Sequence, residues 1–565
     1  MIYFVVTEAN DKKSMKLSIN NFMKVKQIII TGLLMIVFLS GNIFAQQNQP
    51  PTPGTSSKPL ELPNFIIEGK EQVDVRSGIK QFPEKPLAMS QENLDSLNSL
   101  EKQQSLLLQP QPLPNKILNS DFNKGYVIAS VGRYGFAKIE GGYEYNLKEY
   151  TFFGNGGFDY GGEHVKNSAY NKFKLNLFAD YLAPDKYFIF GGSKTRFSML
   201  AGNRNYKLYA VDKPMERNLF DLELGINSEG SYSNFVFSTG ADFKTLQLND
   251  KTTDSKEAVA FDNLLSGYIE IKNMDNNYEL GGRAKADLES VRGNGVSYFE
   301  AGLFGKFDIS KITINLEGGL QFGNNSNDVS RGGLLIRGEI DYKLNENYTI
   351  KASVFTGIRK VSYMEMMNIN PYAQRGIDVD YLYDTPLIKG VIYYHPLKNI
   401  GASAGISIAS SDRTPVFDTL HYDSFILSYE RVNKLDVFSE GYYLLTSKDE
   451  ISYFFSFDYS TLSGNGNIAP YNPLIRVSLN YQKKMMDDKL LAGGELRYIG
   501  KRYADFANEI ELEGYVDLKL NASYKILSNF KVELVLDNLL NSDIYIWQGY
   551  KERGLFFGLK AYYQF

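Results

Sequence analysis

Residues 516–525 read Val-Asp-Leu-Lys-Leu-Asn-Ala-Ser-Tyr-Lys, so apolar side chains alternate with polar or charged ones. Successive side chains of an extended strand point to opposite faces, so one face of this segment suits an apolar medium and the other suits water. The same alternation recurs at 172–181, 312–321 and 475–482. These segments predict strands that separate an apolar environment from an aqueous one.

Residues 124–565 contain 22 such segments, and their connections fall into two alternating classes. The short connections are 147–150, 183–186, 308–311, 344–347, 395–399, 447–450, 486–489 and 527–529. The other class is mostly long and comprises 200–217, 247–260, 322–331, 362–377, 409–423, 461–471, 501–510 and 541–553. Outer-membrane barrels have an even number of antiparallel strands, tight periplasmic turns and longer outer loops. We therefore predict an all-β fold, a transmembrane antiparallel β-barrel of 22 strands over residues 124–565.

Aromatic residues bracket the short connections. The chain has 40 Tyr and 37 Phe but one Trp. The bracketing residues are Tyr145, Tyr150, Tyr181, Tyr187, Tyr342, Tyr348, Tyr443, Tyr453, Tyr524 and Phe530. Rings with an apolar body and a polar tip gather at membrane interfaces, so they predict an aromatic girdle. The alternative, a soluble β-protein with Tyr-rich hairpins, does not require so many strands of evenly divided polarity.

The composition excludes several classes of function. There are 61 Lys and Arg against 65 Asp and Glu, and a net charge of −4 argues against a nucleic-acid partner. Without Cys there is no disulfide, zinc ribbon or thiol catalysis, and three His leave little for imidazole-based metal sites. A mean hydropathy of −0.28 leaves no room for repeated apolar helices long enough to span a membrane.

We predict no catalytic, cofactor-binding or metal-binding residue, and therefore no enzyme. His164 and His421 fall in outer loops and His395 in a short turn, where no Ser and His come together as a hydrolase would need. Three aspartates at 378, 380 and 384 could hold Ca²⁺ through carboxylate oxygens. Alternating aspartates on a water-facing side are more often simply solvated, so no metal is assigned.

Polar residues on the predicted inner face carry both signs of charge, which argues against a strongly charge-selective pore. They are Arg476, Asp517, Lys519, Asn521, Lys531 and Glu533. The Tyr- and Asn-rich outer loops 363–372 and 324–328 are, by position alone, the candidates for ligand contact.

The first 45 residues predict an export signal. The basic residues Lys24 and Lys26 precede an apolar run at 28–38, and Ala45 offers a small residue for cleavage. We expect Met23 to be the true start. A membrane anchor is the alternative, but the apolar run is too short to span a bilayer.

Residues 46–123 are rich in Pro and Gln, and we expect a largely irregular periplasmic or lumenal segment with one helix over 90–108.

Several C-terminal stretches resemble the barrel of TonB-dependent receptors. They are 472–474 (Asn-Pro-Leu), 494–502 (Gly-Glu-Leu-Arg-Tyr-Ile-Gly-Lys-Arg), 514–518 (Gly-Tyr-Val-Asp-Leu), 535–541 (Val-Leu-Asp-Asn-Leu-Leu-Asn) and 549–550 (Gly-Tyr). Two features depart from the family. The last loop has Lys-Glu-Arg-Gly at 551–554 where the family has Pro-Gly-Arg, and residues 46–123 are too few for the family's plug domain. A reduced or missing plug is therefore expected.

The chain also ends in an apolar and aromatic face. Phe557, Leu559, Tyr563 and Phe565 resemble the C-terminal signal by which the barrel assembly machinery recognises outer-membrane proteins. This resemblance implies assembly into the lipid of the outer membrane of a Gram-negative-type bacterium.

The family resemblance implies uptake of a large or scarce ligand, such as an iron chelate, cobalamin or an oligosaccharide, driven through TonB. The run 62–69 is similar to a TonB box, with Leu62, Phe65, Ile66, Ile67 and Glu68 as the contact residues. A stray apolar patch or a remnant plug strand explains the same run equally well. Two other functions remain open: a passive porin-like channel, and a non-transporting surface receptor, adhesin or assembly partner.

Overall fold

The computed structural model describes residues 125–565 except 186, 188, 189, 212, 252–256, 276, 277, 398, 422 and 423. The predicted export signal, the Pro- and Gln-rich segment, its helix over 90–108 and the TonB-box-like run at 62–69 lie outside the described residues.

The described chain forms a sheet of 22 strands, as the alternation predicts. They are β1 (Gly125–Gly132), β2 (Phe136–Leu147), β3 (Tyr150–Gly161), β4 (Tyr170–Leu182), β5 (Lys194–Leu208), β6 (Met215–Tyr232), β7 (Phe235–Lys251), β8 (Glu257–Met274), β9 (Tyr278–Val291), β10 (Asn294–Ile309), β11 (Ile312–Asn324), β12 (Ser330–Lys343), β13 (Tyr348–Lys360), β14 (Tyr381–Leu397), β15 (Ile400–His421), β16 (Ser424–Thr446), β17 (Asp449–Leu462), β18 (Ile475–Met485), β19 (Leu490–Ile499), β22 (Tyr515–Leu527), β23 (Phe530–Asp537) and β26 (Phe556–Gln564).

Smaller elements lie in the connections. They are the helix α3 (Tyr363–Ile369) and two two-stranded sheets, β20 (Arg502–Tyr503) with β21 (Glu511–Leu512) and β24 (Tyr545–Trp547) with β25 (Tyr550–Lys551). Among the described residues, no helix has the length and apolar character needed to cross a membrane.

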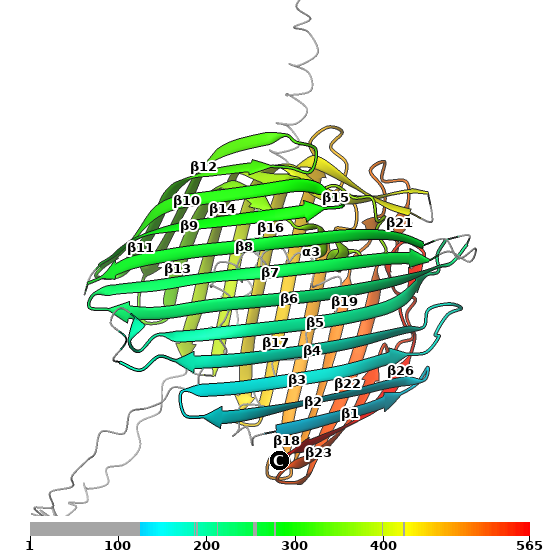
Figure 1. The fold of residues 1–565 in the computed structure, drawn as a ribbon. Coiled ribbons are helices and arrows are strands. Elements are labelled where there is room, and N and C mark those ends of the chain that lie inside the picture. Colours follow the sequence, from blue (N-terminus) through cyan, green and yellow to red (C-terminus); the bar gives the residue numbers. More distant parts are fainter. Residues whose placement is uncertain are drawn as a thin grey trace, which may run out of the picture. The chain divides into compact units, whose positions relative to one another are not determined.

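The sheet closes on itself because its first strand pairs with its last. β1 runs antiparallel to both β2 and β26, with Val127 opposite Tyr563. The backbones of Gly125 and Phe565 exchange hydrogen bonds of 2.8 and 2.9 Å. Figure 1 shows the first strands, in blue, beside the last ones, in red. Closure leaves the barrel without an unpaired edge.

The wall is apolar outside and polar inside, the inverse of a soluble protein. In β18, the exposed Ile475, Val477 and Leu479 alternate with the buried Arg476 and Ser478. Exposed apolar side chains recur around the wall at Val131, Ile139, Phe158, Phe173, Phe197, Leu224, Ile269, Leu303, Leu320, Ile340, Ile388, Ile408, Leu496, Leu534 and Leu559. This polarity is typical of a transmembrane barrel, whose outer surface meets lipid.

All short connections of the predicted list lie at one end of the barrel, together with Gly125 and Phe565; we call it the inner end, and the opposite one the outer end. Of the aromatic residues predicted to bracket these connections, Tyr145, Tyr150, Tyr187, Tyr348, Tyr443, Tyr453 and Tyr524 are exposed there. Neighbouring rings also meet, with centroids 4.8 Å apart for Tyr150 and Tyr181. An aromatic girdle therefore surrounds the inner end.

Three ranges predicted as long connections, 200–217, 247–260 and 409–423, are mostly strand. β15 and β16 pair as far as His421 and Ser424. The backbone N–H and C=O groups continue to pair between strands beyond the apolar part of the wall, so the ladder extends past it. The alternation of apolar and polar side chains marks the part of a strand that lies between an apolar and an aqueous environment. It does not mark where the strand ends.

Candidate functional site

The outer end of the barrel is filled by its own connections. Buried apolar residues from strands and loops form one cluster there, which we call the mouth cluster: Leu219, Leu246, Leu248, Ala260, Val291, Val296, Tyr298, Ile358, Val361, Tyr363, Met366, Met367, Ala373, Ile377, Val379, Tyr381, Phe417, Phe425, Tyr471, Ala504, Leu512, Trp547 and Tyr550. Residues 361–380, which we call the mouth loop, contribute the cluster members from Val361 to Val379.

The mouth loop begins with a short helix that lies against β9. Ser362 caps α3: its hydroxyl accepts from the Glu365 N–H at 3.2 Å, and the Glu365 carboxylate accepts from the Ser362 N–H at 2.7 Å. The backbone N–H of Tyr363 donates to Glu289 of β9 at 3.1 Å. Glu289 also pairs with Lys360 at 2.7 Å. Burial raises the pKa of the Glu365 carboxyl, and the hydrogen bond from Ser362 opposes that rise.

After α3 the mouth loop crosses the barrel opening. The Tyr206 hydroxyl of β5 donates to the Pro371 carbonyl at 2.6 Å. Arg217 of β6 donates to the Pro371 and Ala373 carbonyls at 2.8 and 2.7 Å. The loop itself starts at the end of β13, and strands β7 to β12 stand between β6 and β13 in the ring. These contacts therefore join separate sectors of the wall.

Aromatic rings complete the closure from the other side. Tyr372 of the mouth loop stacks on Tyr550 of β25, with centroids 3.6 Å apart. Trp547 of β24 meets Phe425 of β16 at 5.5 Å and Tyr471 at 4.5 Å. The Gln374 N–H donates to the Phe425 carbonyl at 2.9 Å. Rings from three connections and from β16 thus meet over the opening.

The hairpin of β15 and β16 bends over the same cluster. Its register is interrupted between Ser411 and Thr414, where Arg413 has a φ of 57°. Arg413 pairs there with Asp380 of the mouth loop. Beyond this bulge, the Thr419 N–H donates to the Ala504 carbonyl at 3.1 Å. The bulge redirects the hairpin onto its neighbours, which is the usual effect of an extra residue in one strand.

Trp547 gives a direct test of the closed mouth, because it is the chain's single Trp. Its side chain is 5% exposed, and its indole N–H has no partner within the described residues. We expect blue-shifted fluorescence and weak acrylamide quenching in the folded protein. Emission and quenching like those of the urea-unfolded chain would contradict the packing.

The mouth cluster corrects one expectation from the sequence. The loop 363–372 was expected to offer exposed ligand contacts, yet Tyr363, Met366 and Met367 are fully buried. Tyrosines that do not bracket the short connections also gather in the mouth, among them Tyr298, Tyr363, Tyr381, Tyr471 and Tyr550. The Ser-x-x-Glu pattern of 362–365, a capping box, was the available signal for α3.

The three aspartates weighed as calcium ligands are held apart by arginines. Asp378 pairs with Arg292 at 2.6 Å, Asp380 with Arg413, and Asp384 with Arg359 at 2.5 Å. No group of three or more His, Cys, Asp or Glu side chains among the described residues is arranged to hold a metal ion. Their carboxylates serve to fasten the mouth loop and its flanking strands.

One Ser and one His do come together, contrary to expectation. The Ser168 Oγ lies 3.0 Å from Nδ1 of His164, and it also donates to the Val165 carbonyl at 2.7 Å. The other ring nitrogen lies 2.7 Å from the Lys551 carbonyl. Burial lowers the pKa of His164, while that carbonyl raises it. Ser168 is buried and held within its turn, so the pair fastens loop 162–169 to β25.

The predicted inner-face residues lie in ion pairs and polar contacts. Arg476 and Asp517 are buried, and Asp517 accepts from Arg497 at 2.7 Å and lies 3.7 Å from Lys519. Glu533 accepts from the Tyr562 hydroxyl at 2.7 Å, and the Lys531 ammonium lies 4.1 Å from the Tyr562 ring centroid. Asn521 is half-buried opposite Val535.

The residues of the predicted C-terminal assembly signal face outward. Phe557, Leu559, Tyr563 and Phe565 are all exposed, and three of them lie in β26 between β1 and β23. Phe565 stacks on Tyr143 with centroids 6.2 Å apart.

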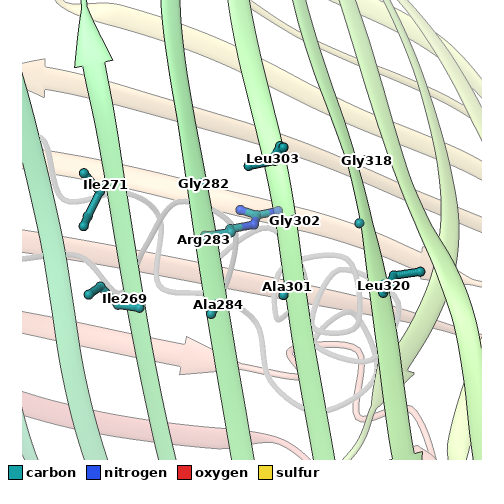
Figure 2. Close-up of a pocket in the computed structure, with 11 residues that line it drawn as sticks. Ile269, Ile271, Gly282, Arg283, Ala284, Ala301, Gly302, Leu303, Gly318 and Leu320 are labelled. Atoms are coloured by element: carbon teal, nitrogen blue, oxygen red, sulfur yellow. The ribbon is translucent and has the colours of Figure 1, made fainter.

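Two hollows of similar size lie on opposite faces of the wall. One, of about 450 Å³, is bordered by Glu365 of the mouth loop and by inward side chains of both charges, among them Asp242, Lys244 and Lys285. The other, of about 490 Å³, is an apolar groove on the outer face. Figure 2 shows Ile269, Ile271, Leu303 and Leu320 around its glycines. The first belongs to the polar inner face of the wall and the second to its apolar outer face.

Comparison with known proteins identifies the fold. No protein-family model matches the sequence, and neither does any curated protein. Among solved structures, the copper transporter OprC has a TM-score of 0.64 and 12% identity, over 81% of this chain and 82% of its own. The siderophore receptor PiuA from Acinetobacter baumannii has a TM-score of 0.62 and 12% identity, over 79% of this chain and 82% of its own. The FrpB iron transporter from Neisseria meningitidis has a TM-score of 0.62 and 10% identity, over 80% of this chain and 83% of its own. The described barrel has the 22-stranded fold of TonB-dependent receptors.

Proposed function

We propose that this chain is an outer-membrane transporter that binds a ligand outside and passes it through the barrel. The observation that carries the proposal is a closed barrel with an apolar outer wall and a polar inner wall, which suits passage of a polar solute across lipid. The metal and siderophore proteins with the same fold favour a metal chelate as the ligand class.

The mouth cluster argues against a passive porin-like channel. A permanently open pore needs a water-filled path, whereas here buried rings and the mouth loop cross the outer opening. In planar bilayers with KCl, we expect the intact chain to give no large steady conductance. A large steady conductance would favour the passive channel instead.

We further propose that uptake is energised through TonB and that the barrel assembly machinery inserts the chain. Residues 62–69 would pair with TonB by adding a strand to it, which requires an extended segment with alternating contacts. The outward Phe557, Leu559, Tyr563 and Phe565 are the proposed recognition face for assembly.

Deleting residues 62–69 tests the energised mechanism. In cells supplied with a ⁵⁵Fe(III)–siderophore chelate, we expect the deletion to abolish accumulation and to leave surface binding unchanged. A deletion of equal length at 72–79 is the matched control and should retain uptake. Unchanged uptake without 62–69 would remove TonB from the proposal. Binding without uptake in the intact chain would favour a surface receptor.

A further inference from the structure

The side chain of Arg217 in β6 forms hydrogen bonds with backbone carbonyls of the mouth loop. Its side chain is 1% exposed. Nε and NH2 donate to the two carboxylate oxygens of Asp250 at 2.7 and 2.9 Å, and NH1 donates to two carbonyls of the mouth loop. A planar guanidinium can satisfy all these acceptors at once because its donors point outward in a fixed fork.

A second pair in the wall shows what is special about Arg217. Arg196 of β5 also forms a two-pronged pair, with Asp180 of β4 directly opposite it, at 2.5 and 2.6 Å. Arg217 and Asp250 are likewise directly opposite on β6 and β7. Arg196 has no hydrogen bond to a loop carbonyl within the described residues. The two pairs thus share geometry, and the bonds to Pro371 and Ala373 distinguish the Arg217 pair.

The mouth loop is fastened differently at its ends and its middle. Near its start, Lys360 pairs with Glu289, and near its end Asp378 pairs with Arg292. Both partners belong to β9 or its turn, and strands β10, β11 and β12 stand between β9 and β13, from which the loop starts. The middle, around Pro371 and Ala373, reaches across the opening to β6. Releasing that middle would uncover the opening while the ends stay in place.

We propose that Arg217, held by Asp250, is the latch of a gate whose moving part is the middle of the mouth loop. Opening breaks the two guanidinium bonds to the Pro371 and Ala373 carbonyls, together with the Tyr206 bond to Pro371 and the Gln374 bond to Phe425, and it separates Tyr372 from Tyr550. Asp250 keeps the guanidinium oriented, so the latch closes again when the loop returns. This inference rests on the proposed function, because a gate has a role only where a solute passes.

The test measures access to position 373, which is fully buried at present. The chain has no Cys, so Ala373→Cys introduces a single thiol and retains the carbonyl that Arg217 binds. The full chain is reconstituted in liposomes and labelled with a membrane-impermeant maleimide. Ser463→Cys, on an exposed outer loop, gives the rate for an open site.

The latch predicts a selective effect. In the Ala373→Cys background, Arg217→Ala should speed labelling about tenfold or more, since charge-assisted bonds to the loop are lost. Arg196→Ala is the matched control and should label at the parent rate. Asp250→Asn should also speed labelling, to a smaller extent, and it replaces Arg217→Ala if that variant does not assemble.

Each other outcome overturns the inference. Equal slow labelling of parent and Arg217→Ala would mean that Arg217 does not hold the loop. Equal acceleration by Arg196→Ala would indicate general loosening of the wall. Labelling of the parent as fast as Ser463→Cys would mean that the mouth is open. No ligand is needed, so a chain that gates but fails to accumulate the chelate would refute the transport proposal alone.

Discussion

Deleting residues 561–565 should abolish assembly of the folded barrel. The deletion removes four of the residue pairs that join β1 to β26, including Ala129 with Ala561 and Val127 with Tyr563. It also removes the backbone bonds between Gly125 and Phe565. Each unpaired N–H or C=O group that faces lipid costs several kcal/mol. With about half of the seam unpaired, the summed cost exceeds the free energy of unfolding of an ordinary protein.

Folded barrels resist SDS until they are heated, so the fraction with altered electrophoretic mobility measures assembly. The control is Gln564→Ala, which keeps the backbone pairing of Gln564 with Tyr126. We expect this control to assemble like the parent. A folded fraction of the truncated chain equal to that of the control would show that neither the seam nor the terminal aromatic face is required.

The second large effect should follow from a charge on the outer face. Leu303 is 75% exposed beside the apolar groove of β8 to β11. Leu303→Arg should lower the free energy of unfolding from lipid by about 2–4 kcal/mol, because the guanidinium enters the apolar part of the bilayer. Urea titration in liposomes, followed by the emission of Trp547, measures this change.

Two variants separate charge from packing. Leu303→Ala removes apolar area without adding charge, and it should cost less than Leu303→Arg. Asn315→Lys places a cation on the inner face beside Glu339, which Asn315 contacts at 3.4 Å, and it should be tolerated. If Leu303→Arg were as stable as Asn315→Lys, the outer face of β10 would not be in contact with lipid.

The wall could be predicted from the sequence because its determinants are local. The alternation in 475–482 or 516–525 is visible within ten residues, and the short connections repeat at regular intervals. Every strand obeys the same rule, so the strand count follows by repetition. Strand ends were harder to predict, because pairing continues through polar stretches such as 409–423.

The closure of the mouth could not be predicted, because it depends on contacts between distant parts of the chain. Tyr372 meets Tyr550, and Arg217 meets Pro371, only after the barrel has brought their strands into one ring. Nothing in the local sequence distinguishes these tyrosines from those of the girdle. Only the capping box of α3 could have indicated an ordered element within the loop.

The pairing of β1 with β26 has a consequence for the order in which the molecule is made. Gly125 and Phe565 stand at opposite ends of the described chain, so the ring cannot close before β26 has been synthesised. Until then β1 has a free edge, and so does the most recently synthesised strand. Such edges invite pairing with other chains. The unclosed chain must therefore be shielded along its whole length, and the time between the synthesis of β1 and the pairing of β26 sets how long that protection lasts.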